Sequence, residues 1–277
     1  MKKIISCFAI IIVLCFAPAA FAEVESTLEA DELNFNVKTK EASALGNVVY
    51  THGEDVIRGD KAEGNIDKKI TVYGNPVKAD ARSQTTKLDA KRVAWTADAT
   101  KKTSGFYEAF ENVHIKRDNG DFLNAAYVKA DTENNVYDAK GNVEALYEGK
   151  YIKAAEAHRN GATFNGKNVA KLEDRVKKYA ISAARVEGKI NAKDEITDAT
   201  ADQNVVFDHT DKQGLRSRLY GDHAVYSKAK GTLVVTGNAH GLRSDGKKIS
   251  ADMLVYHETT EQVDAIGKTK ITFITSK

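Results

Sequence analysis

A short pattern recurs eight times along this chain, and its clearest copy is the segment 249–254, ISADML. A branched apolar residue is followed by a small residue two positions later and by another apolar residue three positions after that. Periods of about 20 to 50 residues are typical of repeat architectures, in which each repeat adds a layer to one core. The copies start 29 to 38 residues apart, at Leu28, Ile57, Leu88, Leu123, Ile152, Ile181, Leu219 and Ile249.

A second recurrent element, Gly-Asn-Val in its fullest form, alternates with the first one along the whole chain. It occupies residues 46–48, 74–75, 111–113, 141–143, 166–169, 203–205 and 237–239, and the eighth position, 267–269, lacks the Asn. Two elements that keep alternate phase over the whole chain indicate a true repeat. The repeat is least regular between residues 161 and 202.

Between these elements, apolar residues alternate with polar ones at a period of two, as in Leu33, Phe35 and Val37. Such alternation predicts half-buried β-strands. Residues 169–179 carry apolar residues at roughly helical spacing, but their place in the repeat matches 48–59, so we expect a hairpin there. We expect no amphipathic helix after the N-terminal segment.

Predicted turn segments recur about twice per repeat, and most contain Gly, Asn or Asp, which tolerate the backbone of tight turns. Two turns per repeat predict two strands per repeat, and therefore about sixteen short antiparallel strands. The ten to fifteen residues that separate the second element from the next triplet suit a hairpin and exclude a crossover helix. Such a meander must fold on itself as a sandwich, a jelly roll or a solenoid.

The first 22 residues are predicted to be a cleaved signal peptide, with Lys2 and Lys3 before an apolar run at 4–16 and the small-residue site 20–22. We expect the remainder, 23–277, to form one domain. Both cysteines lie in this leader, so the mature chain forms no disulfide. Without the two leader lysines, the 39 remaining basic residues equal the 39 acidic ones, which argues against nucleic-acid binding.

Catalytic and metal-binding patterns are not found in the sequence. No two histidines have metal-ligand spacing, and no Gly-x-Ser-x-Gly turn or Gly-rich phosphate loop occurs. Acids recur inside the triplet, yet three other copies carry alanine there, so we expect these acids to pair with turn or backbone donors and not with calcium. We therefore expect no enzyme activity, no metal and no cofactor. The acids are Asp31, Asp60, Asp222 and Asp252, and the alanines are Ala126, Ala155 and Ala184.

The stretches 30–48 (ADELNFNVKTKEASALGNV) and 251–269 (ADMLVYHETTEQVDAIGKT) resemble the OstA-like family, and weaker copies cover the rest of the predicted mature chain. The resemblance implies an elongated, twisted, open antiparallel β-jelly roll in which two sheets meet as a V. It also implies a periplasmic protein that holds the acyl chains of lipopolysaccharide (lipid A) and bridges the inner and outer membranes. The implied partners are LptC-like and LptD-like proteins of the same fold, together with further copies of this chain joined head to tail through the terminal strands 23–37 and 270–277.

A lipid groove would be lined by the inward apolar positions, since each methylene group moved out of water contributes roughly 0.8 kcal/mol. For any one of these positions ordinary core packing is the favoured explanation, and only the whole set, left unfilled in the middle, would form a lipid site. The alternatives are an LptC-like component of the same machine, or a structural or adhesive surface β-solenoid without lipid. The predicted groove residues are Leu33, Phe35, Val48, Ile57, Val72, Val93, Trp95, Val113, Ile115, Val128, Val143, Ile152, Val205, Phe207, Leu219, Ile249, Leu254, Ile271 and Phe273.

Overall fold

The computed structural model describes residues 25–81, 85–98, 105–192 and 195–273. This part of the chain is all-β, as expected, and contains twenty strands and no helix. No helix that could cross a membrane therefore occurs among the described residues. The predicted leader and its cleavage site lie outside them. Two compact units are present: an N-terminal unit (25–146 and 158–161) and a C-terminal unit (147–157 and 162–273).

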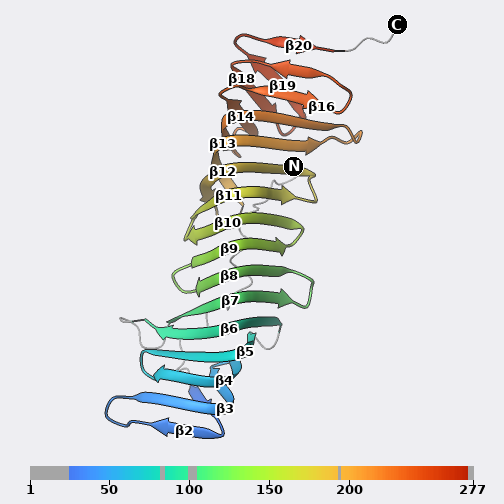
Figure 1. Cartoon of the computed structure of the whole chain (residues 1–277). Coiled ribbons are helices and arrows are strands. Elements are labelled where there is room, and N and C mark those ends of the chain that lie inside the picture. The colour runs from blue at the N-terminus through green and yellow to red at the C-terminus, as the bar shows by residue number, and fades with distance from the viewer. Residues whose placement is uncertain (1–24, 82–84, 99–104, 193–194, 274–277) are drawn as a thin grey trace. The chain divides into compact units, whose positions relative to one another are not determined.

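The N-terminal unit is an antiparallel meander in which each strand from β3 to β8 pairs with the next, and β1 and β2 both pair with β3. The order of its strands can be followed in Figure 1. They are β1 (Ser26–Glu29), β2 (Glu32–Phe35), β3 (Glu41–His52), β4 (Asp55–Asn65), β5 (Lys69–Ala81), β6 (Thr86–Ala97), β7 (Gly105–Arg117), β8 (Phe122–Asp131) and β9 (Val136–Tyr147).

The C-terminal unit is also an antiparallel meander, and β10 (Lys150–Asn160) is divided between the two units. β11 to β14 pair in sequence, and β14 then pairs with both β15 and β16; β18 and β19 follow β15, whereas β17 and β20 follow β16. The strands are β11 (Thr163–Asp174), β12 (Tyr179–Ile190), β13 (Ile196–Thr210), β14 (Arg216–Ser227), β15 (Thr232–Thr236), β16 (His240–Arg243), β17 (Lys248–Ser250), β18 (Met253–His257), β19 (Gln262–Ile266) and β20 (Lys270–Thr272). The described pairings are antiparallel, which contradicts the alternative of a β-solenoid with parallel coils.

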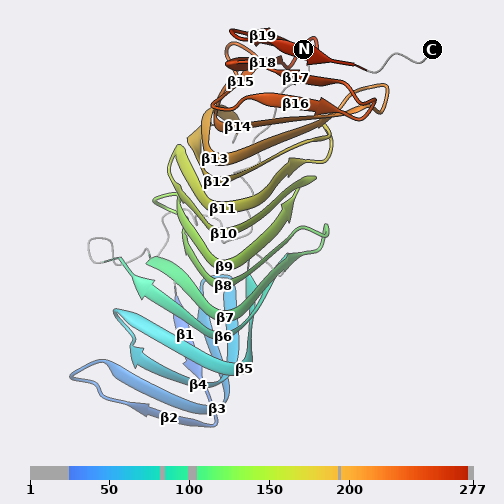
Figure 2. The ribbon, with the colours of Figure 1, turned by 45° about the horizontal axis from the view of Figure 1, so that its top comes forward.

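The Gly-Asn-Val element forms a β-bulge that bends the strand. In β3 the register shifts between Leu45 and Val48, and the two intervening residues, Gly46 and Asn47, have φ values of +76° and +47°. Asn or Gly has a positive φ at each later complete copy of the element except 74–75. Because two residues face one on the neighbouring strand, the ladder turns at this point. Figure 2 shows β7, β8 and β9 bent near their middles. We call the two halves of a bent strand its arms.

The triplet element lies opposite the bulge on the neighbouring strand, which explains why the two elements alternate. The Asp31 N–H donates to the Gly46 carbonyl at 2.9 Å, and the Asn47 amide donates to the Asp31 carboxylate at 2.9 Å. The same amide–carboxylate bond joins Asn238 to Asp222 at 2.8 Å. The expectation that the recurrent acids pair with turn or backbone donors is confirmed at these two positions.

The twenty strands correspond to sixteen bent strands, as two strands per repeat predict. Near both ends of the described chain the strands are interrupted at the bend. β15 with β16 and β19 with β20 are halves interrupted at the second element, whereas β1 with β2 and β17 with β18 are halves interrupted at the triplet that faces it. The other twelve strands continue across the bulge and reach 10 to 15 residues, so they are longer than the short strands expected. Residues 169–179 form the end of β11, a turn and the start of β12, which confirms the expected hairpin.

Each unit is rolled up, and the strand register demonstrates it. Trp95 connects by register through Ile70 and Gly64 to Ala42, at one end of β3. His52 lies at the other end of β3, and in a flat sheet it would be about 33 Å from Ala42 along the strand. The His52 and Trp95 ring centroids are nevertheless 4.5 Å apart. The sheet of the N-terminal unit therefore folds over at its bulges until the ends of the arms, which we call the rims, meet.

The C-terminal unit is rolled in the same way. Tyr256 connects by register through β15, β14 and β13 to Gly188 on β12. His209 pairs with Tyr179 at the opposite end of β12, about 30 Å from Gly188 along an extended strand. The His209 and Tyr256 ring centroids are 5.2 Å apart. Within each unit, these register relations describe an antiparallel β-jelly roll in which side chains join the two rims.

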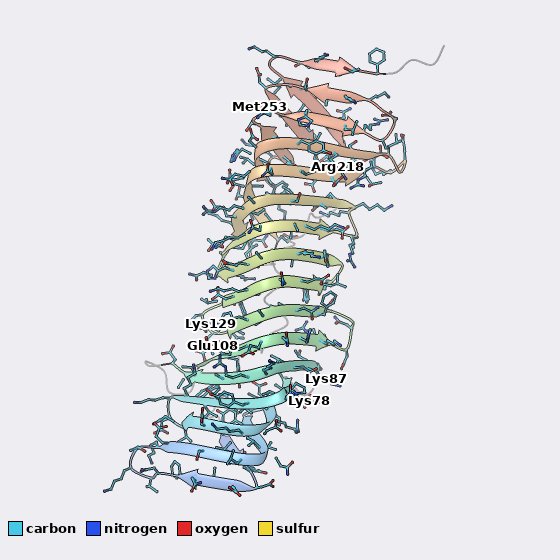
Figure 3. The ribbon with its side chains drawn as sticks, in the orientation of Figure 1. Lys78, Lys87, Glu108, Lys129, Arg218 and Met253 are labelled. Atoms are coloured by element: carbon cyan, nitrogen blue, oxygen red, sulfur yellow. The ribbon has the colours of Figure 1, made fainter. Side chains whose placement is uncertain are left out.

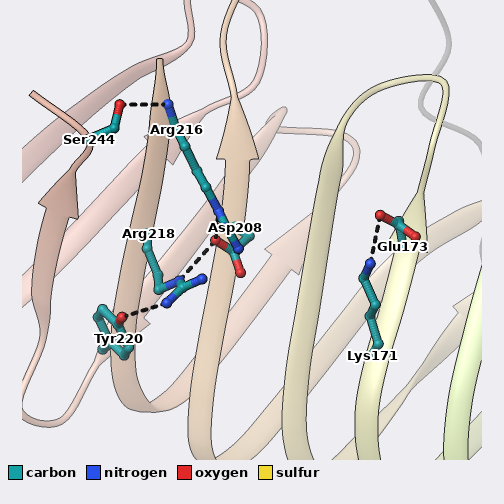
Figure 4. Close-up of polar contacts among 7 residues, drawn as sticks. All are labelled: Lys171, Glu173, Asp208, Arg216, Arg218, Tyr220 and Ser244. Atoms are coloured by element: carbon teal, nitrogen blue, oxygen red, sulfur yellow. Dashed lines mark hydrogen bonds and ion pairs between the residues drawn. The ribbon is translucent and has the colours of Figure 1, made fainter. Parts of the chain in front are cut away.

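The outer faces carry polar and aromatic side chains that contact one another across strands. Glu108 on β7 and Lys129 on β8 are register partners, and Figure 3 labels both. Glu108 accepts a hydrogen bond from the Tyr127 hydroxyl at 2.8 Å and pairs with Lys69 at 3.3 Å. On the C-terminal unit, Asp208 accepts bonds from two arginines, which Figure 4 shows. Burial opposes ionisation of Asp208, but these guanidinium groups outweigh it and lower its pKa.

Candidate functional site

The interior of the N-terminal unit is filled by its own side chains. Ile57, Ile70, Val72, Val113 and Leu123 are each at most 1% exposed. Its rims are closed by large aromatic residues, since the buried rings of Tyr50, Trp95 and Tyr107 lie on the inner face. Close packing of this kind leaves little room for a guest molecule.

The C-terminal unit contains an apolar cavity between its two arms, with a volume of about 100 Å³. One arm contributes residues of β11, the first part of β12 and the second part of β13. The other contributes residues from the remainder of β12 and β13 and from β14, β15 and β18. The lining residues are Leu172, Tyr179, Ile181, Val186, Ile196, Ala199, Thr200, Ala201, Phe207, Ala224, Tyr226, Thr232, Leu233, Tyr256 and Glu258.

Several of these lining side chains are apolar, face inward and are still only half-buried. Tyr179, Ile181 and Ile196 are in this class. In the N-terminal unit, Ile57, which starts a triplet as Ile181 does, is 1% exposed. The space beside the three side chains is therefore not filled by protein atoms, and they present apolar surface that a ligand can cover.

Polar side chains gather at one end of the cavity, where the rims approach each other. Lys177, in the turn between β11 and β12, lies 3.8 Å from Glu258, which follows β18 on the opposite rim. A second pair, Lys212 and Glu261, also joins the rims, at 4.0 Å. These ion pairs join the rims in addition to the ring contact between His209 and Tyr256.

Burial is the main electrostatic influence at this polar end. It raises the pKa of the Glu258 carboxyl, while Lys177, Lys228 and the Tyr226 hydroxyl act in the opposite direction. Burial, followed by the charge of Glu258, raises the pKa of Tyr226. Lys228 is held by Glu195, which is itself buried at 5% exposure. Two carboxylates and two ammonium groups thus balance each other beside an apolar space.

The nineteen groove residues predicted from the sequence fall into three groups. Ile249 is half-buried, and Leu33, Phe35, Ile271 and Phe273 are between 45% and 61% exposed. Of the nineteen, Phe207 borders the cavity described above. Phe207 and the remaining members are buried in the cores of the two units. This buried group consists of Val48, Ile57, Val72, Val93, Trp95, Val113, Ile115, Val128, Val143, Ile152, Val205, Phe207, Leu219 and Leu254.

Most of the cavity lining was not predicted from the sequence, including Tyr179, Ile181, Tyr226, Tyr256 and Glu258. Tyr179 and Ile181 alternate like any half-buried strand, so their pattern does not distinguish a cavity wall from a core. One signal was available. The longest interval between repeats, 38 residues, starts at Ile181, and the repeat is least regular between 161 and 202, which includes part of the cavity wall.

The fold and the cavity define a class of protein: an antiparallel β-jelly roll with an apolar internal site. Among the described residues, no group of three or more His, Cys, Asp or Glu side chains is arranged to hold a metal ion. No protein-family model and no curated protein matches the chain.

One solved structure to which the chain is similar is LptH from Pseudomonas aeruginosa. That protein is described as the LptA-homologous periplasmic component of the conserved lipopolysaccharide transport device. The match has a TM-score of 0.39 and 15% sequence identity, and it covers 45% of this chain and 95% of the other.

Proposed function

We propose that this chain is a periplasmic lipopolysaccharide-binding transport protein of the LptA type, which shields acyl chains in the cavity of its C-terminal unit. The apolar cavity between the two arms is the observation that carries this proposal. The two recurrent elements, which resemble those of the OstA-like family over the whole predicted mature chain, support it.

The size of the cavity indicates how it would be used. A cavity of about 150 Å³ holds one benzene molecule, and this one is smaller, at about 100 Å³. In the described state it can take the end of an acyl chain but not a whole one. Side chains join the rims near Lys177 and Lys212, so the arms can separate there without loss of strand pairing. Each further methylene group that enters then contributes roughly 0.8 kcal/mol.

Exposed apolar edges support the proposed partners. In the described chain β2 pairs with β3 alone and β20 with β17 alone. Leu33 and Phe35 on β2, and Ile271 and Phe273 at β20, are exposed. Unpaired strand edges recruit further strands. The proposal therefore includes head-to-tail association, with copies of this chain and with LptC-like and LptD-like proteins, in a bridge between the membranes.

Site-specific photo-crosslinking in cells tests lipid binding. A photoreactive phenylalanine analogue placed at Phe207, which borders the cavity, is expected to crosslink to lipopolysaccharide. The matched control is Phe106, which packs under the Lys129 ammonium group, 4.0 Å from its ring centroid. Equal crosslinking from both positions, or none from Phe207, contradicts the proposal.

The edge contacts have their own test. Replacing Ile271 and Phe273 by Asp is expected to abolish concentration-dependent oligomers in light scattering. Val225→Asp serves as the control, because Val225 is also an exposed apolar residue, at 39%, but lies inside the sheet on β14. Unchanged oligomers in the edge variant contradict the proposed association.

A further inference from the structure

The polar end of the cavity places a carboxylate between two lysines. Glu258 lies 3.8 Å from Lys177, which belongs to the opposite rim. Lys228, at the end of β14, acts on the same carboxylate electrostatically and is itself paired with Glu195. The buried hydroxyl of Tyr226 also faces Glu258. Lysines from both sides of the cavity thus converge on one negatively charged group.

This arrangement matches the chemistry of an anionic amphiphile. The wall of the cavity is formed mostly by apolar residues and includes Glu258, the carboxylate on which Lys177 and Lys228 act. An alkyl chain fits the first part, and a phosphate or carboxylate fits the second, because hydrogen bonds between ammonium and oxyanion groups are among the stronger ones in proteins.

We propose that Lys177 and Lys228 bind the anionic group of an amphiphile whose chain lies in the cavity, and that Glu258 occupies this place when the ligand is absent. This inference rests on the proposed function insofar as the cavity takes an alkyl chain. It adds the position of the head group and the residues that select it.

Charge balance explains why the exchange is feasible. Lys177 and Lys228 face Glu258 and Glu195, so the cluster is neutral in the described state. A ligand anion that replaces Glu258 restores the same balance, while Lys228 keeps its contact with buried Glu195. Retaining Glu258 as a half-buried carboxylate has a cost, and full solvation of its charge after displacement recovers that cost.

The exchange also couples ligand binding to opening of the site. Glu258 and Lys177 belong to opposite rims, so displacement of the carboxylate removes one of the two ion pairs that join them. Separation of the rims therefore creates space for the rest of the alkyl chain next to the site where the head group binds.

Binding of dodecyl phosphate and dodecanol to the full mature chain tests the head-group site. The two probes share the alkyl chain and differ in charge. By titration calorimetry, the wild-type protein should bind dodecyl phosphate roughly tenfold more tightly than dodecanol. Lys177→Met should remove that preference without weakening dodecanol binding. Glu258→Gln should strengthen dodecyl phosphate binding, because the competing carboxylate is gone.

Lys171→Met is the matched control. Lys171 forms a 2.9 Å pair with Glu173 on the same strand, as Figure 4 shows. Neither residue lines the cavity. It should leave both affinities unchanged. Lys228 is not substituted, since buried Glu195 would lose the cation that pairs with it and the variant could fail to fold. Near-ultraviolet circular dichroism verifies that each variant is folded.

The outcomes separate this inference from the proposed function. If both probes bind equally and Lys177→Met changes neither affinity, the head-group site is wrong while the apolar cavity stands. If neither probe binds the wild-type protein, the lipid-binding function fails as well. Inorganic phosphate is the third probe: binding as tight as that of dodecyl phosphate would indicate a site for the free anion and would overturn the proposal.

Discussion

The two units contain the same repeat and the same bulge, yet one interior is filled and the other is not. In the N-terminal unit, the buried aromatic rings of Tyr50, Trp95 and Tyr107 fill the space near the rims. In the C-terminal unit, the ion pair of Lys177 with Glu258 joins the rims beside a cavity of about 100 Å³. The bulge therefore determines that the sheet rolls up, and the rim residues determine whether the roll has an empty interior.

The largest expected difference between the units concerns loss of an isoleucine side chain. Ile70→Ala in the filled core should cost about 2–5 kcal/mol of unfolding free energy, because it leaves a closed void. Ile181→Ala should cost under about 2 kcal/mol, since Ile181 is half-buried and already borders a cavity. Urea unfolding of both variants measures this difference. Equal losses of unfolding free energy would mean that side chains fill the cavity in solution, as they fill the core around Ile70.

Filling the two interiors gives the converse comparison. Ala109 is 3% exposed in the packed unit, so Ala109→Leu should destabilise by about 1–3 kcal/mol through overpacking. Ala199 is half-buried and lines the cavity. Ala199→Leu should leave stability nearly unchanged and should weaken dodecanol binding in calorimetry. Unweakened dodecanol binding would show that the alkyl chain lies elsewhere.

The bend at Asn238 in the C-terminal unit and the bend at Asn142 in the N-terminal unit differ in one hydrogen bond, and exchanging it tests the role of the recurrent acid. Asp222→Ala removes the 2.8 Å bond from Asn238 and should cost about 1 kcal/mol. In the N-terminal unit Ala126 lies opposite Gly141 and Asn142. Ala126→Asp should gain a comparable amount if Asn142 can donate to it. Thermal unfolding of both variants measures the two changes, and a loss in both would contradict the exchange.

The smallest expected effect is a pH dependence at the ionic rim. The Glu258 pKa is raised above its ordinary value of 4.5, so the folded state binds this proton more tightly than the unfolded state. The corresponding stability is present below pH 4.5 and is lost as the pH rises through the raised pKa. Glu258→Gln should remove this component from the pH dependence of urea unfolding.

Asp208 provides a control of opposite sign for that experiment. Its pKa is lowered below the ordinary 3.8, so its contribution is present above that pH and is lost on acidification through the lowered pKa. Asp208→Asn should therefore flatten the acidic end of the profile only. A change in this variant above pH 4.5 would show that the group titrating there is not Glu258.

The repeat made the fold predictable from the sequence. Alternating apolar residues and two turns per repeat predicted the antiparallel strands. The alternation of the triplet with Gly-Asn-Val along the chain arises because the bulge faces the triplet of the neighbouring strand, as Gly141 faces Ala126. A Cβ atom on Gly141 would lie 2.6 Å from the Ala126 Cβ, so glycine is the residue that fits there. These are contacts between neighbouring strands, which a local pattern can encode.

The interior was decided by tertiary structure alone. Val72 and Ile181 have the same alternation in sequence, yet one is fully buried in a core and the other borders a cavity. The difference arises from residues that meet when the rims come together, such as His52 with Trp95 and Lys177 with Glu258. These partners are separated by 43 and 81 positions in the chain, and no repeat period relates them. Period and turn chemistry specify each strand and its neighbour, whereas the volume enclosed depends on side chains from opposite ends of the bent sheet.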